Sequence, residues 1–166
     1  MELREFGPDD EAEIRLAVDI ENARCAVDAP WEYPVTPYRK EMEMRHGWDG
    51  EVARHFLAYD EQILGYASLS TSEWDNKDLA WLGLTIDPEH RRSGHGSRLL
   101  ARLIALSGDV GRSLVGVDGW EIPGVEAFAA ASGFVKKSQA INRRMHLAEA
   151  DLTEVRRLRD VAAEKA

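Results

Sequence analysis

The residues whose types and spacing best suit chemistry lie in one short stretch, residues 87–100, which read DPEHRRSGHGSRLL. Two adjacent arginines, Arg91 and Arg92, are followed by glycines at positions 94 and 96, and an apolar helical pattern begins directly after them. The first amides of a helix lack intrahelical partners and lie at the positive end of the helix dipole. Because glycine has no side chain to cover these amides, the stretch predicts a site for a diphosphate.

The local charge supports this interpretation. Residues 88–102 contain four arginines and one glutamate, a surplus of three positive charges in a chain whose formal net charge is −9. Two other glycine-rich nucleotide motifs are excluded, because the third glycine of the dinucleotide fingerprint is replaced by Leu99 and no Gly-Lys-Ser/Thr is present. The residues alone leave one alternative open, in which the glycines and arginines only form the start of a helix and bind no ligand.

The stretch resembles the cofactor loop of the GNAT superfamily, the acetyl-CoA-dependent N-acetyltransferases. Their pattern Arg/Gln-x-x-Gly-x-Gly/Ala is matched from Arg91 to Gly96, directly after the strand end Ile86-Asp87-Pro88. Further along, AFAAASGF is similar to the end of a helix in that family, with Gly133-Phe134 in register. The resemblance covers roughly residues 2–147.

The resemblance implies acetyl-CoA as acyl donor and assigns the residues that bind it. Main-chain groups at the end of the central strand would pair with the pantetheine arm, and the loop amides would hold the diphosphate. Either Arg91 or Arg92 would add charge-assisted hydrogen bonds. The implied cofactor-binding residues are Leu84, Thr85, Ile86, Arg91, Arg92, Ser93, Gly94, His95, Gly96 and Ser97.

The two acid–base residues that the family often uses are missing. The position of the usual tyrosine, directly after Phe128, is Ala129, and the positions of the usual strand carboxylate are Leu82 and Gly83. The catalytic residues therefore stay unassigned, and the resemblance implies a backbone amide near Leu84 as the donor to the oxyanion.

Two functions follow from this departure. The first is a working N-acetyltransferase that acts on a primary amine and moves protons through water or through Asp118, Glu121, Glu32 or Tyr33. The second is a catalytically silent GNAT-fold domain that binds acyl-CoA or forms a structural half of a larger protein. The segment SLSTSEWDNKDLA and the loop are similar to the first half of actinobacterial-type tandem GNAT proteins. A homodimer or a second GNAT domain is therefore expected as the partner.

The acceptor side is expected in residues 28–37 and 118–124, DAPWEYPVTP and DGWEIPG, by position in the family. Both segments combine aromatic and acidic side chains, which suit a small cationic amine. The alternative is that the tryptophans are core residues, which we expect of Trp81 and leave open for Trp31. The candidate acceptor-binding residues are Trp31, Glu32, Tyr33, Asp118 and Glu121.

These residues must be positioned by a mixed set of elements. Residues 3–6, 52–60, 63–72, 79–86 and 113–117 predict strands, the last two of them buried, and residues 134–147 predict one or two more. Helices are expected from Asp9 or Asp10 to about Val27, from Pro37 to His46, from Ser97 to Gly108, before Ser132, and in the tail. The expected fold is α/β, a GNAT-type mixed, mostly antiparallel central sheet with helices on both faces, comprising residues 1–147, followed by a helical tail or linker, residues 148–166.

The amino-acid composition excludes several further classes of protein. The 166 residues, 44% hydrophobic and 31% charged, fit one globular domain and argue against disorder. The lone Cys25 excludes an intrachain disulfide, and the histidines show no metal-ligand spacing. The acidic charge disfavours nucleic acid, and neither a membrane span nor a signal peptide is apparent. A cytoplasmic protein without a metal is expected.

Overall fold

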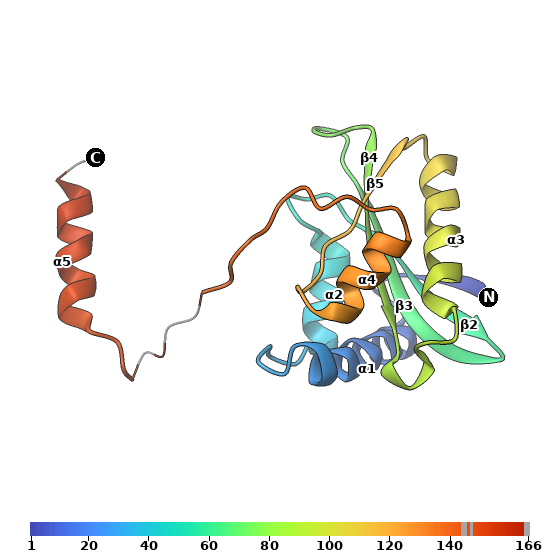
Figure 1. Cartoon of the computed structure of the whole chain (residues 1–166), viewed down its shortest axis with the longest axis horizontal. Coiled ribbons are helices and arrows are strands. Elements are labelled where there is room, and N and C mark those ends of the chain that lie inside the picture. The colour runs from blue at the N-terminus through green and yellow to red at the C-terminus, as the bar shows by residue number, and fades with distance from the viewer. Residues whose placement is uncertain (144–145, 147, 165–166) are drawn as a thin grey trace. The chain divides into compact units, whose positions relative to one another are not determined.

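The fold centres on one mixed sheet, seen in a computed structural model that describes residues 1–143, 146 and 148–164 (Figure 1). The strands are β1 (Glu2–Phe6), β2 (Arg54–Asp60), β3 (Gln62–Thr71), β4 (Leu79–Ile86) and β5 (Leu114–Gly116), in that spatial order. The pairs from β1 to β4 are antiparallel, and β4 and β5 are parallel. The predicted fold class is therefore confirmed.

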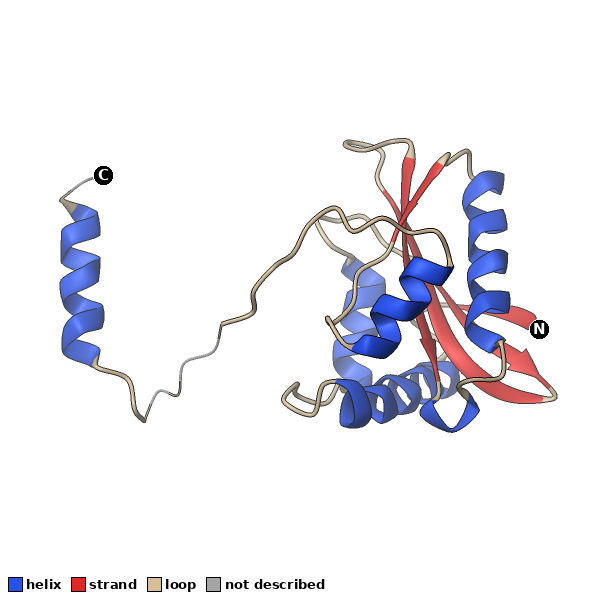
Figure 2. Cartoon of the chain, in the orientation of Figure 1, coloured by secondary structure: helices blue, strands red, loops and turns tan. Residues whose placement is uncertain are grey.

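Helices of the same unit cover both faces of this sheet (Figure 2). They are α1 (Glu11–Asp28), α2 (Pro37–His46), α3 (His95–Asp109) and α4 (Pro123–Ala131), with a short 3-10 helix η1 (Pro88–His90). A further helix, α5 (Leu152–Ala163), follows later in the chain. The predicted start of α2 is confirmed, because the Thr36 hydroxyl accepts a hydrogen bond from the Arg39 amide and proline follows at the first helical position. None of the helices in the described part of the chain is long and apolar enough to cross a bilayer.

The core lies on both sides of the three long strands. On one face, Leu57 and Tyr66 pack with Ile14 and Val18 of α1 and Met44 of α2. Most of the apolar stripe that the sequence predicts for α3 is buried, with Leu99 and Leu103 fully covered, whereas Ile104 is 44% exposed. The predicted burial of Cys25 is also confirmed.

Two expectations for the end of the sheet are wrong. No strand forms in residues 134–143 or at 146, and residues 144, 145 and 147 lie outside the described residues. The strand at residues 113–117 forms only as the three-residue β5, whose Leu114 is 61% exposed instead of buried. Because β5 is so short, it offers few backbone groups for a further strand to pair with and little cover for its neighbour Trp81. That side chain is 51% exposed, although it was expected in the core.

The chain divides into two compact units, Met1–Gly133 and Phe134–Ala166. The first contains the sheet and its helices. The second contains α5, whose N-terminal Asp151 side chain accepts hydrogen bonds from the amides of Thr153 and Glu154. The assignment of residues 148–166 as a tail or linker stays a proposal.

Candidate functional site

The loop between β4 and α3 takes a left-handed backbone conformation at two positions. Arg92 and Gly94 both adopt left-handed conformations, with φ of 65° and 78°. Helix α3 begins at His95, and the Arg98 amide is bonded to the Gly94 carbonyl at 3.2 Å. The amides of residues 95–97 therefore belong to the first turn, where a helix leaves its amides for an outside acceptor.

The two glycines of this loop have different surroundings. A Cβ at Gly94 would meet no atom within 4 Å, so this position opens onto free space. A Cβ at Gly96 would lie 3.3 Å from the Phe128 ring of α4. Gly94 therefore provides the left-handed turn and an open approach to the amides, whereas Gly96 allows α4 to pack against the start of α3.

The structure distinguishes the two arginines that the sequence left equivalent. The Arg91 guanidinium donates to both carboxylate oxygens of Asp28, at 2.9 and 2.8 Å, and its Nε donates to the Ile86 carbonyl at 3.2 Å. Arg92 has neither a hydrogen bond nor an ion pair to any described residue. Arg91 therefore ties the loop to the end of α1, and Arg92 is the arginine that is available to an anion.

The strand that leads into this loop has one open edge. β4 pairs with β5 only through Leu79, Ala80 and Trp81, and among the described residues no strand pairs with that edge from Leu82 to Ile86; its last carbonyl, that of Ile86, accepts the hydrogen bond from Arg91 Nε. Leu84, Thr85 and Ile86 are half-buried on this stretch, immediately before the loop. An extended ligand could add to this edge as a further strand does.

The positions of the missing strand carboxylate have a packing explanation. Leu82 is buried in the core. Gly83 is the register partner of Ser68 on β3, and a Cβ at Gly83 would lie 2.4 Å from the Ser68 hydroxyl oxygen. A side chain at position 83 would therefore have to displace that hydroxyl. Ala129, at the position of the usual tyrosine, is half-buried on α4.

The two predicted acceptor segments come together. The rings of Trp31 and Trp120 meet edge to face, with centroids 5.5 Å apart and planes at 84°. Trp120 is the aromatic side chain of the second predicted segment. Tyr33, Asp118 and Glu121 are exposed in the same two connections.

Glu32 faces α1. One of its carboxylate oxygens lies 3.4 Å from the Arg24 guanidinium and 3.5 Å from the Cys25 sulfur. Burial raises the pKa of the Cys25 thiol, so this cysteine is kept in its unreactive form.

A buried polar network lies beneath the sheet, and the sequence did not predict it. His55 Nδ1 and the Tyr66 hydroxyl share a hydrogen bond of 2.6 Å, and Lys40 Nζ donates to the same hydroxyl at 3.4 Å. Lys40 is paired with Glu21 at 2.9 Å and with Glu43 at 3.2 Å. The network therefore joins α1 and α2 to strands β2 and β3.

Burial sets the protonation of this network. It lowers the pKa of His55 to about 4, so the imidazole is neutral near pH 7. It also raises the pKa of Glu21, against the opposing effect of Lys40, and raises that of Tyr66 well above its usual value. His55 Nε2 has no partner among the described residues.

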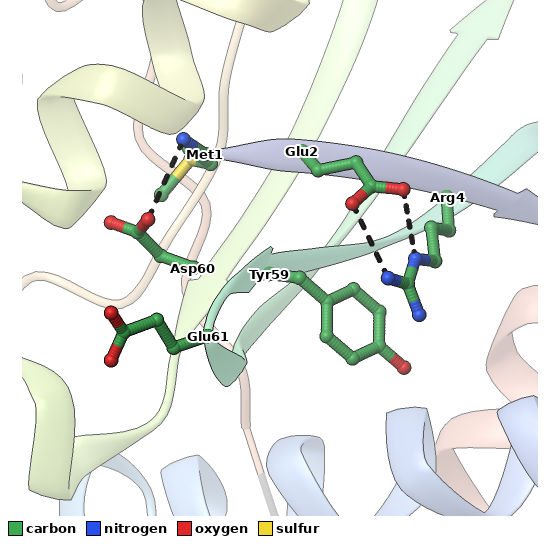
Figure 3. Close-up of a pocket in the computed structure, with 6 residues that line it drawn as sticks. All are labelled: Met1, Glu2, Arg4, Tyr59, Asp60 and Glu61. Atoms are coloured by element: carbon green, nitrogen blue, oxygen red, sulfur yellow. Dashed lines mark hydrogen bonds and ion pairs between the residues drawn. The ribbon is translucent and has the colours of Figure 1, made fainter.

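Two hollows lie on the surface of the described residues, and the second of them reaches the start of the β4–α3 loop. A polar recess of about 370 Å³ lies beside β1 and the β2–β3 turn. Figure 3 shows the residues that line it, among them Arg4, which pairs with Glu2 and lies over the Tyr59 ring. Asp60 in this recess pairs with Arg98 of α3 at 2.8 Å. A second, more apolar groove of about 560 Å³ runs along α1; it is lined by Leu16, Asp19, Ile20, Ala23, Val27, Ile63, Asp87, Pro88 and Glu89.

Sequence comparison supports the resemblance drawn from the loop. The profile of the "Acetyltransferase (GNAT) family" matches residues 21–134. The chain is 31% identical to the mycothiol acetyltransferase of Gordonia bronchialis over 98 residues, which cover 59% of this chain and 30% of that protein. It is 33% identical to the mycothiol acetyltransferase of Rhodococcus jostii over 110 residues, which cover 66% and 34%. The chain thus spans about a third of the length of these relatives.

Structural comparison supports the fold. An aminoglycoside acetyltransferase from an uncultured soil metagenomic sample, solved with sisomicin, superposes with a TM-score of 0.65 at 15% identity, covering 88% of this chain and 95% of the other. A tandem GNAT protein from the clavulanic acid biosynthesis pathway superposes with a TM-score of 0.68 at 19% identity, covering 80% and 43%. With the family profile matched over most of the chain, these findings lead to one assignment: the chain belongs to the GNAT family of acetyltransferases.

Proposed function

We propose that this protein is an acetyl-CoA-dependent N-acetyltransferase that acetylates a primary amine of a small cationic molecule. The observation that carries the proposal is the open edge of β4, which runs directly into a loop with an open left-handed glycine, free helix amides and an available arginine. These features suit the two chemically different halves of coenzyme A, an extended amide-bearing arm and a diphosphate.

Each half has its own residues in this proposal. The main chain of Leu84, Thr85 and Ile86 holds the pantetheine arm along the open edge. The diphosphate lies at the amides from Arg92 to Ser97, including Ser93 and His95, and Arg92 adds a charge-assisted hydrogen bond. Arg91 shapes the loop through Asp28 and does not itself bind the ligand.

The reaction needs a neutral amine beside the thioester. The amine nitrogen attacks the carbonyl carbon, a C–N bond forms, and the C–S bond breaks as the thiolate leaves. The nitrogen gives up one proton and the thiolate takes up one, so the proton count balances. A backbone amide near Leu84 stabilises the oxyanion of the tetrahedral intermediate.

The acceptor is proposed to lie beside the Trp31–Trp120 pair. Aromatic faces attract ammonium groups, and Glu32, Asp118 and Glu121 bring carboxylates to the same two connections. Mycothiol and aminoglycosides, which appear in the names of similar proteins, belong in the first panel of acceptors, together with polyamines, amino acids and peptide N-termini.

The test is thiol release from acetyl-CoA across this panel of amines. Turnover with cationic amines supports the proposal, and activity confined to neutral or anionic acceptors refutes the proposed acceptor class. If the protein does not bind acetyl-CoA, the function itself is refuted.

A second candidate is a catalytically silent domain that binds acyl-CoA. The observation that favours it is the absence of both usual acid–base side chains, at Gly83 and Ala129. In that case a second GNAT domain or a second copy of this chain would be its partner. Tight binding of acetyl-CoA without thiol release for any amine would select this candidate.

A further inference from the structure

We propose that the Ser68 hydroxyl orients the acceptor amine at the reacting centre. The inference deepens the proposed function and rests on it. It assigns a role to a β3 residue, next to the strand position where the carboxylate is missing.

The register of the sheet places Ser68 in a row of side chains on one face. Its partner on β4 is Gly83, and its partner on β2 is His55. Directly opposed residues in antiparallel strands project on the same face. Tyr66, two residues before Ser68, packs with α1 and α2, so Ser68 projects toward that same side of the sheet.

The Ser68 hydroxyl occupies the space above Gly83. The Ser68 hydroxyl oxygen lies 2.4 Å from an ideal Cβ at Gly83, whereas the next atoms, the Cβ and amide nitrogen of Ser68, lie at 3.7 and 3.8 Å. Only the hydroxyl therefore excludes a side chain from position 83. Glycine at this position uncovers the hydroxyl, since a larger residue would have to displace it.

The hydroxyl is also available to a ligand. Ser68 and Gly83 are both half-buried. Within the described residues the Ser68 oxygen has no hydrogen-bond partner. Gly83 directly precedes Leu84, where the open edge of β4 begins to hold the thioester in the proposed function. An amine that approaches the thioester from this face therefore reaches Ser68.

The groups around Ser68 do not supply an accessible base. His55 on β2 is 2% exposed, and burial holds its pKa near 4. On the helix side, Lys40 and Glu43 of α2 and Glu21 of α1 are engaged with one another. The Ser68 oxygen therefore accepts a hydrogen bond from an N–H of the neutral amine and directs the nitrogen lone pair at the thioester. The proton that the amine releases goes to water, and water protonates the thiolate.

The first test compares Ser68→Ala with Ser68→Thr, with acetyl-CoA as donor and spermidine and sisomicin as acceptor probes. Loss of one orienting hydrogen bond predicts a fall in kcat of about tenfold for Ser68→Ala. The KM for acetyl-CoA stays unchanged, and Ser68→Thr, which keeps the hydroxyl, stays within about threefold of wild type. An unchanged kcat in Ser68→Ala overturns the inference.

The second test uses the steric conflict between the Ser68 hydroxyl and a side chain at position 83. Gly83→Glu alone should lower the melting temperature because of the collision with Ser68, and Ser68→Ala in the same chain should restore it. The double variant places a carboxylate base beside the amine, so its turnover extends to lower pH than that of wild type, which follows the neutral fraction of the amine. Identical pH profiles of the double variant and wild type overturn the inference.

A separate result would show that the proposed function itself fails. If the wild-type protein releases no thiol with any acceptor probe, both the proposed function and the inference about Ser68 are overturned. If wild type turns over and the Ser68 variants match it, only the inference fails.

Discussion

The residues of the loop between β4 and α3 have different roles that their types alone did not reveal. Arg91 and Arg92 are equivalent in sequence, but Arg91 pairs with Asp28, 63 positions earlier in the chain. Such a distant partner leaves no local signal in the sequence. His55 shows the same limit, because alternation placed it in a strand but could not show that its ring is buried against Tyr66.

Gly94 gives the sharpest test of the loop at this scale. We predict that Gly94→Asp weakens acetyl-CoA binding at least tenfold, because its carboxylate would stand beside the diphosphate. Gly94→Asn is the matched control, since Asn and Asp both tolerate the left-handed conformation and differ mainly in charge. Calorimetric affinities that are equal for the two variants would contradict the placement of the diphosphate.

His55 predicts how stability depends on pH. Its folded pKa of about 4 lies below the ordinary value of 6.5, so the unfolded chain binds more protons between these values. The free energy of unfolding therefore falls by roughly 2–4 kcal/mol as the pH drops through this window, in addition to the effect of other groups. Denaturant unfolding of His55→Gln should show a correspondingly smaller pH dependence. Equal pH dependence in both proteins would show that His55 does not titrate in this way.

At the scale of elements, the signals that worked were local. Thr36-Pro37 marked the start of α2, and the strand patterns at residues 52–60 and 63–72 left only a tight turn between β2 and β3, where Glu61 is left-handed. The sequence patterns failed to predict features that depend on which other strands lie beside an element. Residues 113–117 have the composition of a buried strand, but burial depends on a further strand that does not form in residues 134–143. The open edge of β4, which carries the proposed function, likewise depends on how short β5 is.

The contact between α1 and the loop is the element-scale prediction. Asp28, at the end of α1, is 12% exposed and binds Arg91 through both oxygens. Asp28→Asn removes a charge-assisted pair, so we expect the free energy of unfolding to fall by about 1–3 kcal/mol and acetyl-CoA binding to weaken severalfold. Denaturant unfolding and calorimetry measure the two effects.

The control for this prediction is Glu5→Gln. Glu5 also binds an arginine, Arg54, through both oxygens, but in an exposed position on β1 and β2. Exposed pairs contribute at most about 1 kcal/mol, so this variant should lose little stability and no affinity for acetyl-CoA. If Asp28→Asn behaves like Glu5→Gln, the loop does not depend on α1.

At the scale of the whole molecule, all proposed cofactor-binding residues lie in the unit Met1–Gly133. The family assignment and the fold class could be predicted because they rest on a contiguous motif and on the order of elements. The proposed acceptor site could be predicted only as two segments, since the Trp31–Trp120 contact joins residues far apart in sequence. We propose that residues 1–147 form the domain that binds acetyl-CoA and that residues 148–166 link it to a partner.

The central claim is that the open edge of β4 and the loop after it bind acetyl-CoA. Its most direct test is the melting temperature of the full chain with and without excess acetyl-CoA. At 100 times the dissociation constant, binding stabilises the fold by about 2.7 kcal/mol. For a chain of this size, that free energy predicts a rise in melting temperature of roughly 5–10 °C. An unchanged melting temperature at that excess would contradict the claim.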